Sequence, residues 1–186
     1  MQFERKWKNA SMVRVGKGKW EHVYEYSLWS NMVNRVGRTK RYEDVLLSEA
    51  FLNYDDWLDW ARTQKGFMSR DENGKLFHMD KDLLSGGAGV VYCPNSVVFI
   101  PRQLNAMVTR SSKGKLRGIQ TFHRGGRDVH TVKFNLDGKT HYYGSFGDIE
   151  VAKEVAAGVW KKNLITVTSR YDLDTRVEQA IFELSY

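Results

Sequence analysis

The sequence predicts an α+β fold in two parts: N-terminal helices with a strand–strand–helix unit, then a three-stranded antiparallel sheet packed on one helix. Three patterns predict this: helical spacing of apolar residues over 22–68, strand alternation twice over 74–110, and three strand patterns followed by a helix pattern over 118–163. A flexible basic stretch at 111–116 separates the two parts. We therefore expect one domain at 1–110 and a second at 111–186.

Composition places the chain among globular proteins and excludes several classes. Of its 186 residues, 41% are hydrophobic and 27% are charged. No apolar run approaches the roughly 20 residues that a membrane helix needs, and no secretory signal is visible at the start. Cys93 is the single cysteine, which excludes an intrachain disulfide and the usual cysteine-based zinc sites. The glycine-rich loop at 85–89 lacks a following Gly-Lys-Ser/Thr, so no nucleotide cofactor is expected.

Positive charge is concentrated in one stretch of the chain. The sequence has 29 Lys and Arg against 22 Asp and Glu, a net charge of +7. Residues 111–147 carry seven basic and two acidic side chains, whereas residues 148–186 carry five basic and seven acidic ones. A local excess of this kind predicts a face that binds anions such as nucleic acid. A basic soluble protein without such a partner is the alternative.

Two helices are predicted in the N-terminal part. Tyr26 and Trp29 belong to a set of apolar residues that recur at intervals of three and four, so they share one helix face. A second helix is expected over 51–60, with Asn53 or Asp55 as its N-cap. Trp57 and Trp60 are expected to be packing groups rather than base-stacking groups.

A strand, a long turn, a second strand and a short helix follow over 74–110. Period-two alternation in the first strand directs an imidazole and two carboxylates to one face: His78, Asp80 and Asp82. Asn105 lies in the helix that follows the second strand. Oxygen ligands suit a hard divalent cation, and a neighbouring histidine can take a proton from water. Spacing alone leaves two interpretations open: a site for metal-assisted phosphodiester hydrolysis, or solvated turn carboxylates beside a surface histidine.

Residues 77–84, 91–95 and 98–105 resemble the HNH homing endonucleases of bacteriophages, and the helical stretch before them resembles the lead-in of those proteins. The resemblance implies a ββα-metal nuclease core that binds one divalent cation, Mg²⁺ or Mn²⁺. It also implies hydrolysis of DNA to a 5′-phosphate and a 3′-hydroxyl.

The resemblance further implies roles for individual residues. The metal ligands would be Asp80, Asp82 and Asn105, and the catalytic set would be His78, Asp80 and Asn95. One departure matters, because the family's Asp-His pair is absent: Lys81 follows Asp80 directly. The alternative is therefore a catalytically impaired DNA-binding protein that acts by occupying its site.

Three strands and a helix are predicted over 118–163, with Asp137-Gly138 as a hairpin turn and Asp148 as the helix N-cap. Strict alternation directs the apolar residues toward the helix: Ile119, Val132, Phe134, Tyr142 and Phe146. The opposite face then carries basic, amide and aromatic side chains: Gln120, Phe122, Arg124, Lys133, Asn135, His141 and Tyr143. Arg117, next to the basic linker, is expected to contribute as well.

A face of this composition suits double-stranded DNA. Arg pairs with guanine, amides pair with adenine, Lys holds phosphate, and a ribbon of strands can enter the major groove. The alternative is a solvated polar sheet face without a ligand.

The pattern of Gly118, Val132, Gly138, residues 143–146 and Ala156 closely resembles the DNA-binding domain of plant ethylene-response factors. The same module occurs at the C-terminus of phage HNH endonucleases. Family members often carry Arg and Trp on the recognition face, so we expect a different DNA specificity here. Together the two resemblances imply a monomeric DNA endonuclease in the cytoplasm of an infected bacterial cell.

Overall fold

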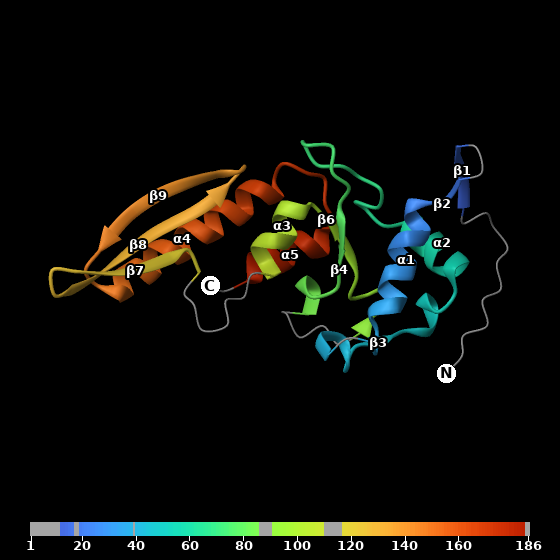
Figure 1. Ribbon diagram of the computed structural model, residues 1–186, viewed down its shortest axis with the longest axis horizontal. Coiled ribbons are helices and arrows are strands. Elements are labelled where there is room, and N and C mark those ends of the chain that lie inside the picture. The colour runs from blue at the N-terminus through green and yellow to red at the C-terminus, as the bar shows by residue number, and fades with distance from the viewer. Residues whose placement is uncertain (1–11, 17–18, 39, 86–90, 110–116, 185–186) are drawn as a thin grey trace. The chain divides into compact units, whose positions relative to one another are not determined.

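The structure is a computed structural model that describes residues 12–16, 19–38, 40–85, 91–109 and 117–184. It combines helices with strands, as predicted (Figure 1), and no helix in the described part is long and apolar enough to cross a membrane. The chain divides into two compact units, Met1–Pro101 and Arg102–Tyr186. This division falls ahead of the boundary expected at residue 110. The linker at 111–116 and most of the loop at 85–89 lie outside the described residues.

Aromatic rings pack two α-helices together in the first unit. Helix α1 spans Tyr24–Arg35 and helix α2 spans Tyr54–Arg62. The side chain of Asn53 accepts backbone N–H groups from the first turn of α2, the nearer at 2.8 Å, which confirms it as the N-cap. Trp29 Nε1 donates to the carbonyl of Phe51 at 2.9 Å. Trp57 is fully buried and the ring centroid of Trp60 lies 4.6 Å from that of Phe51, so both serve packing, as expected.

Short strands and 3₁₀ turns complete the first unit: β1 Met12–Gly16, β2 Lys19–His22, η1 Lys40–Tyr42, β3 Leu46–Leu47, η2 Glu49–Phe51, β4 His78–Asp80, η3 Leu83–Ser85, β5 Val91–Tyr92 and β6 Val98–Ile100. β1 pairs with β2 and β4 with β6, both antiparallel, while β3 and β5 pair in parallel. The first strand of the predicted hairpin is shorter than expected, because the chain turns into η3 soon after Asp80.

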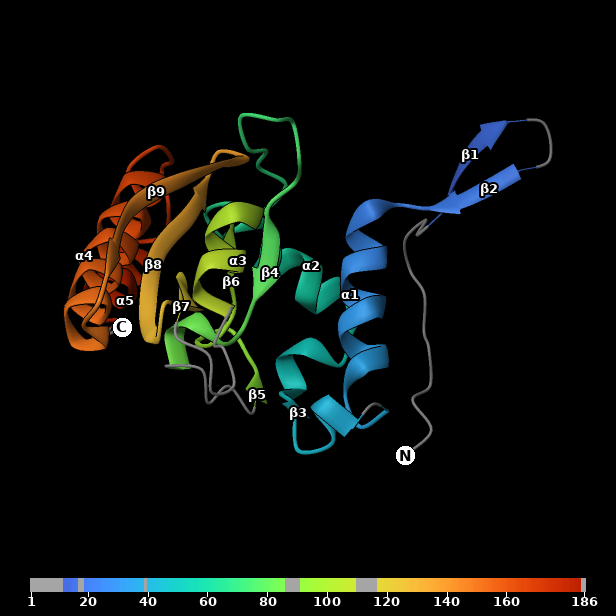
Figure 2. The same ribbon diagram turned by 60° about the vertical axis from the view of Figure 1, so that its left-hand side comes forward.

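The second unit begins with helix α3, Arg102–Thr109. Its sheet has the order β7-β8-β9 and is antiparallel throughout: β7 Ile119–Arg124, β8 Arg127–Leu136 and β9 Lys139–Phe146. Helix α4, Ile149–Thr168, runs along this sheet (Figure 2), and helix α5, Thr175–Glu183, packs on α4. Asp148 caps α4 by accepting the N–H of Glu150 at 2.8 Å. The predicted three-strand-plus-helix arrangement is therefore confirmed.

The β8–β9 turn is fixed to the helices of its own unit. Asp137 and Gly138 both have positive φ, 54° and 75°, as the predicted Asp-Gly hairpin turn requires. The Asp137 carboxylate accepts two hydrogen bonds from Arg170 at 2.7 and 2.9 Å and one from Gln103 at 3.2 Å. These bonds, led by that of Arg170, lower the pKa of Asp137. The carboxylate at this turn is thus occupied by partners within the unit.

Candidate nucleic-acid interface

One face of the β7–β9 sheet is covered by α4. Val132 of β8 is fully buried against Ala152 and Ala156 of α4. Partly buried apolar side chains surround these three: Ile119, Phe134, Tyr143, Phe146 and Val155. The small alanines let the helix approach the strands closely. This face builds the core, so any ligand of the sheet must use the opposite one.

The opposite face, called the open face below, is defined by strand register. Directly opposed residues of antiparallel strands share a face, and the register gives its members: Gln120, Phe122, Arg124, Arg127, Val129, Thr131, Lys133, Asn135, Thr140, Tyr142 and Ser145. Five of the seven side chains predicted for this face lie on it: Gln120, Phe122, Arg124, Lys133 and Asn135.

The open face is basic. Its charged members are Arg124, Arg127 and Lys133, and none of the residues in β7, β8 or β9 places a carboxylate there. The acidic residue of β8, Asp128, opposes His123 on the other face, where its Oδ1 lies 2.9 Å from His123 Nδ1. The positive charge of the open face is therefore not neutralised by strand carboxylates.

A β-bulge in β9 reverses the expected alternation. Val132 opposes Gly144 while the next residue, Lys133, opposes Tyr142, so one extra residue is inserted at Tyr143. Gly144 has φ +131°, and a Cβ there would lie 2.8 Å from the ring of Phe146. Only glycine fits this position, and an isolated glycine within a strand pattern is a known sign of a bulge.

The predictions for the two tyrosines and for His141 were therefore wrong in orientation. Tyr142, expected in the core, is 62% exposed on the open face. Tyr143 instead packs beside the core, its ring centroid 6.3 Å from that of Phe134. His141 opposes Phe134 and so belongs to the helix side of the sheet, although it is exposed. Strict alternation failed because it allows no inserted residue.

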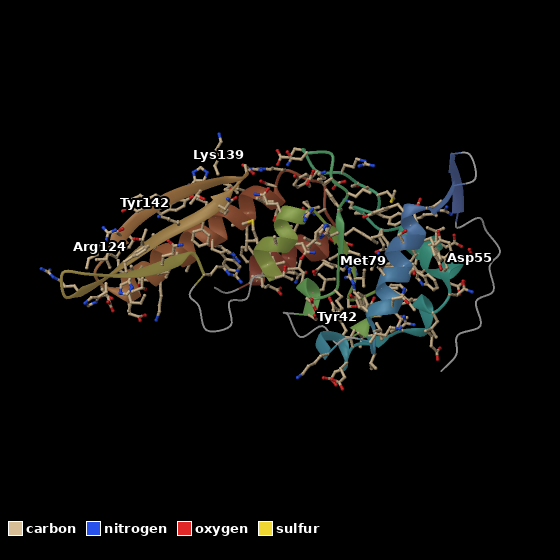
Figure 3. All side chains as sticks on the ribbon, viewed as in Figure 1. Tyr42, Asp55, Met79, Arg124, Lys139 and Tyr142 are labelled. Carbon is tan, nitrogen blue, oxygen red and sulfur yellow. The ribbon has the colours of Figure 1, made fainter. Side chains whose placement is uncertain are left out.

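A chain of hydroxyl groups holds Tyr142, which is labelled in Figure 3, on the open face. Tyr142 Oη donates to Ser145 Oγ at 3.1 Å, and Ser145 Oγ lies 2.8 Å from Thr131 Oγ1. Thr131 is buried within the strands although it belongs to the open face. The exposed ring is thereby anchored at its hydroxyl end. Sequence reasoning missed these three residues and Arg127.

Arg117 has a packing role in the second unit. Its guanidinium carbon lies 4.3 Å from the centroid of the Trp160 ring of α4, which is a cation–π distance. The residue precedes β7 and is not a member of the open face. The guanidinium group of Arg117 thus lies against α4, and its DNA contact stays a prediction.

In the first unit, the β4–β6 hairpin uses Asp80 for local structure. Its Oδ1 accepts the backbone N–H groups of Asp82 at 3.0 Å and Leu83 at 2.8 Å. Asp80 is only 5% exposed, and burial raises the pKa of its carboxyl group although the Leu83 hydrogen bond opposes this. The carboxylate therefore caps the turn into η3.

Buried Lys81 and half-buried Asp82 form a charge pair beside aromatic rings. Lys81 Nζ donates to Asp82 Oδ1, and it lies 5.7 Å and 5.6 Å from the ring centroids of Tyr42 and Tyr92. Burial raises the pKa of Tyr92 to about 12. The lysine directly after Asp80 is thus engaged by Asp82 and by two tyrosine rings.

The remaining predicted site residues lie on a strand, a turn and a helix. His78 of β4 is exposed, Asn95 is exposed in the turn before β6, and Asn105 belongs to the second unit, where its Oδ1 accepts from Thr109 Oγ1 at 3.0 Å. Within the described part of the chain, no three His, Cys, Asp or Glu side chains form a group that could hold a metal ion. Of the predicted ligands, Asp80 is engaged by backbone N–H groups and Asp82 by Lys81, so the binding of Mg²⁺ or Mn²⁺ stays a prediction.

Comparison with known proteins gives no family assignment. No protein-family model matches the chain, and neither the curated proteins nor the solved structures contain a match. Function is therefore inferred from the residues of this chain and their geometry.

Proposed function

We propose that this protein binds double-stranded DNA through the open face of the β7–β9 sheet. One observation carries the proposal: three strands present cationic, amide and aromatic side chains together on a face without strand carboxylates. Phosphate contacts from Lys and Arg supply affinity, while amide and aromatic groups contact base edges. The net charge of +5 over residues 111–147 supports the same ligand.

Each kind of side chain on this face has a defined task. Lys133 holds a backbone phosphate, and the amides of Gln120 and Asn135 form hydrogen bonds with adenine. Phe122 and Tyr142 contact thymine methyl groups or sugars. Because the Tyr142 hydroxyl is held by Ser145, this exposed ring is oriented before DNA binds.

The binding test uses the full chain with a random-sequence duplex library at low salt, followed by affinity measurements on the selected duplex. Tyr142→Ala is expected to weaken binding and Gln120→Ala to relax preference at one base pair. His141→Ala is the matched control, because that exposed side chain lies on the other face. An unchanged affinity for Tyr142→Ala together with a large loss for His141→Ala would contradict the proposal.

Cleavage of the bound DNA is the second part of the proposal and makes the protein a phage-type HNH homing endonuclease. It rests on the resemblance of residues 77–105, with exposed His78 as the base that accepts a proton from water. Supercoiled phage and host DNA incubated with Mg²⁺ or Mn²⁺ should be nicked or cut. His78→Ala should then lower the rate by about 10²–10⁴.

The second candidate is a DNA-binding protein that acts by occupying its site. A specific observation favours it: Asp80 Oδ1 is engaged by two backbone N–H groups, and the next residue is a lysine. DNA that remains intact with either metal at concentrations that saturate binding would support occupancy and contradict cleavage. Cutting that is lost in His78→Ala would contradict occupancy.

A further inference from the structure

Two arginines face each other at the tip of the β7–β8 hairpin. Arg124 ends β7, Arg127 begins β8, and they are directly opposed across a two-residue loop. Gly125 and Gly126 form that loop with φ of +57° and +77°. Positive φ at both positions is typical of the tightest hairpin turn, which glycine adopts without strain. The two arginine side chains, called the tip arginines below, therefore start from a fixed, close separation on the open face.

The charge of the tip arginines has no acidic counterpart among the residues that the structure describes. Among the described residues neither forms an ion pair, and the neighbouring Asp128 is turned to the other face by its contact with His123. Arg124 contacts an aromatic ring: its guanidinium carbon lies 5.8 Å from the centroid of Phe122. Such a contact orients a guanidinium group without neutralising it.

Like charges directly opposed on a sheet destabilise it, and this pair sits where one anion can reach both groups. Directly opposed Cβ atoms lie about 5 Å apart, so two flexible arginine side chains can converge on a single oxyanion. A guanidinium group matches phosphate through paired N–H donors. A phosphate shared by the two guanidinium groups therefore accepts hydrogen bonds from both and removes the repulsion between them.

We infer that the tip arginines bind one phosphate of the DNA backbone between them. The inference deepens the proposed function and depends on it for the identity of the ligand. It assigns Arg124 to backbone positioning, in place of the guanine contact that its position on the strand suggested. The tip then sets affinity and register on the duplex, while base preference comes from the middle of the open face.

The test measures binding of the full chain to a selected and to a random duplex over a range of salt concentrations. Arg124→Ala and Arg127→Ala should each weaken binding to both duplexes by the same factor, about tenfold. Each should reduce the slope of log affinity against log salt by about one. The double variant should lose little more than either single variant, because both remove the same phosphate contact.

A control for charge alone is Lys139→Ala. Lys139 opposes Leu136 at the other end of the sheet, away from the hairpin tip (Figure 3), so its removal should change affinity by less than about twofold. Losses that multiply in the double variant, with a salt slope reduced by two, would overturn the shared phosphate. A change of base preference at one position in Arg124→Ala would overturn the backbone assignment.

A second measurement separates failure of the inference from failure of the proposed function. Inorganic phosphate is titrated into the labelled full chain while the arginine Nε–H NMR signals are followed. Signals of both tip arginines should shift together, and Arg127→Ala should remove the shift of Arg124. Absence of duplex binding by the wild-type chain would overturn the proposed function, and a joint shift with phosphate would still support the anion site. If the signals of the tip arginines shift neither with inorganic phosphate nor with the duplex, the inference is overturned.

Discussion

The β4–β6 hairpin and the β7–β9 sheet present their polar side chains in opposite ways. In the hairpin, Asp80 is buried and caps a turn, and Lys81 is enclosed by aromatic rings and paired with Asp82. In the sheet, the carboxylates Asp128 and Asp137 have partners away from the open face. The cations on that face are left facing solvent or a ligand.

This difference shows that strand alternation predicts the face on which a side chain lies but not the groups that it contacts. In the hairpin the chain turns directly after β4. The backbone N–H groups of that turn need acceptors, and the Asp80 carboxylate provides one. In the sheet the backbone is satisfied by long ladders of strand hydrogen bonds. Its side chains are therefore available for binding, which is why the functional proposal rests on the sheet.

The largest effect is expected from Gly118→Ala, which should destabilise the sheet although Gly118 is not a member of the open face. Gly118 has φ +72°, and a Cβ would lie 2.3 Å from the ring of Phe134. We expect a loss of more than about 2 kcal/mol in the free energy of unfolding, from backbone strain and steric overlap. Hydrogen exchange of β8 amides measures it in the second unit.

Gly158→Ala is the matched control. Gly158 lies within α4 with no atom in the way of a Cβ, so alanine should stabilise the helix by about 0.5–1 kcal/mol. Equal protection of the β8 amides in Gly118→Ala and in the wild type would show that the close approach of Gly118 to Phe134 is wrong.

The bulge is tested by comparing Tyr143→Ala with Tyr142→Ala. Tyr143 packs beside the core, so its truncation should cost about 1–3 kcal/mol of stability. Tyr142 is exposed, so its truncation should cost less than about 0.5 kcal/mol and act on DNA affinity instead. Chemical denaturation measures both losses of stability. A larger loss for Tyr142→Ala than for Tyr143→Ala would contradict the bulge.

Asp80→Ala and Asp80→Asn separate the capping role from a charge-dependent role. Alanine removes the acceptor for two N–H groups and should cost about 0.5–2 kcal/mol. Asparagine retains an acceptor oxygen and removes the buried charge, so its stability at neutral pH should equal or exceed that of the wild type.

The difference in stability between the wild type and Asp80→Asn should depend on pH with a definite sign. Because the pKa of Asp80 is raised in the folded state, the native protein binds its proton more tightly than the unfolded chain does. Wild-type stability relative to Asp80→Asn should therefore fall as pH rises from the ordinary value of 3.8 through the raised pKa, then level off. A relative stability of the wild type that rises with pH would contradict the burial of this carboxylate.

The smallest expected effect is a gain in the stability of the fold. Arg127→Ala removes one of two opposed like charges, so stability should rise by about 0.2–1 kcal/mol at low salt while DNA affinity falls. Thermal unfolding at low and high salt checks it, because screening should abolish the gain. A loss of stability in Arg127→Ala would indicate that the tip arginines do not repel each other.

How much the sequence predicted differs between the two units for physical reasons. Period-two alternation, the Asp137-Gly138 turn and the Asp148 cap predicted the sheet and its helix, since long ladders hold a regular pattern. Gly144 was the single sign of the bulge, and its significance depends on the Phe146 ring. In the first unit, the capping role of Asp80 could not be predicted, because it depends on where a three-residue strand ends.

The most direct test of the open face is an NMR titration of a mixed-sequence duplex into the ¹⁵N-labelled full chain at low salt, following side-chain amide signals. Gln120 and Asn135 project from the open face, whereas the amide of Gln179 is held by Glu183 within α5. The signals of Gln120 and Asn135 are expected to shift and broaden while that of Gln179 stays in place. Unmoved signals for Gln120 and Asn135 at saturating DNA would contradict it.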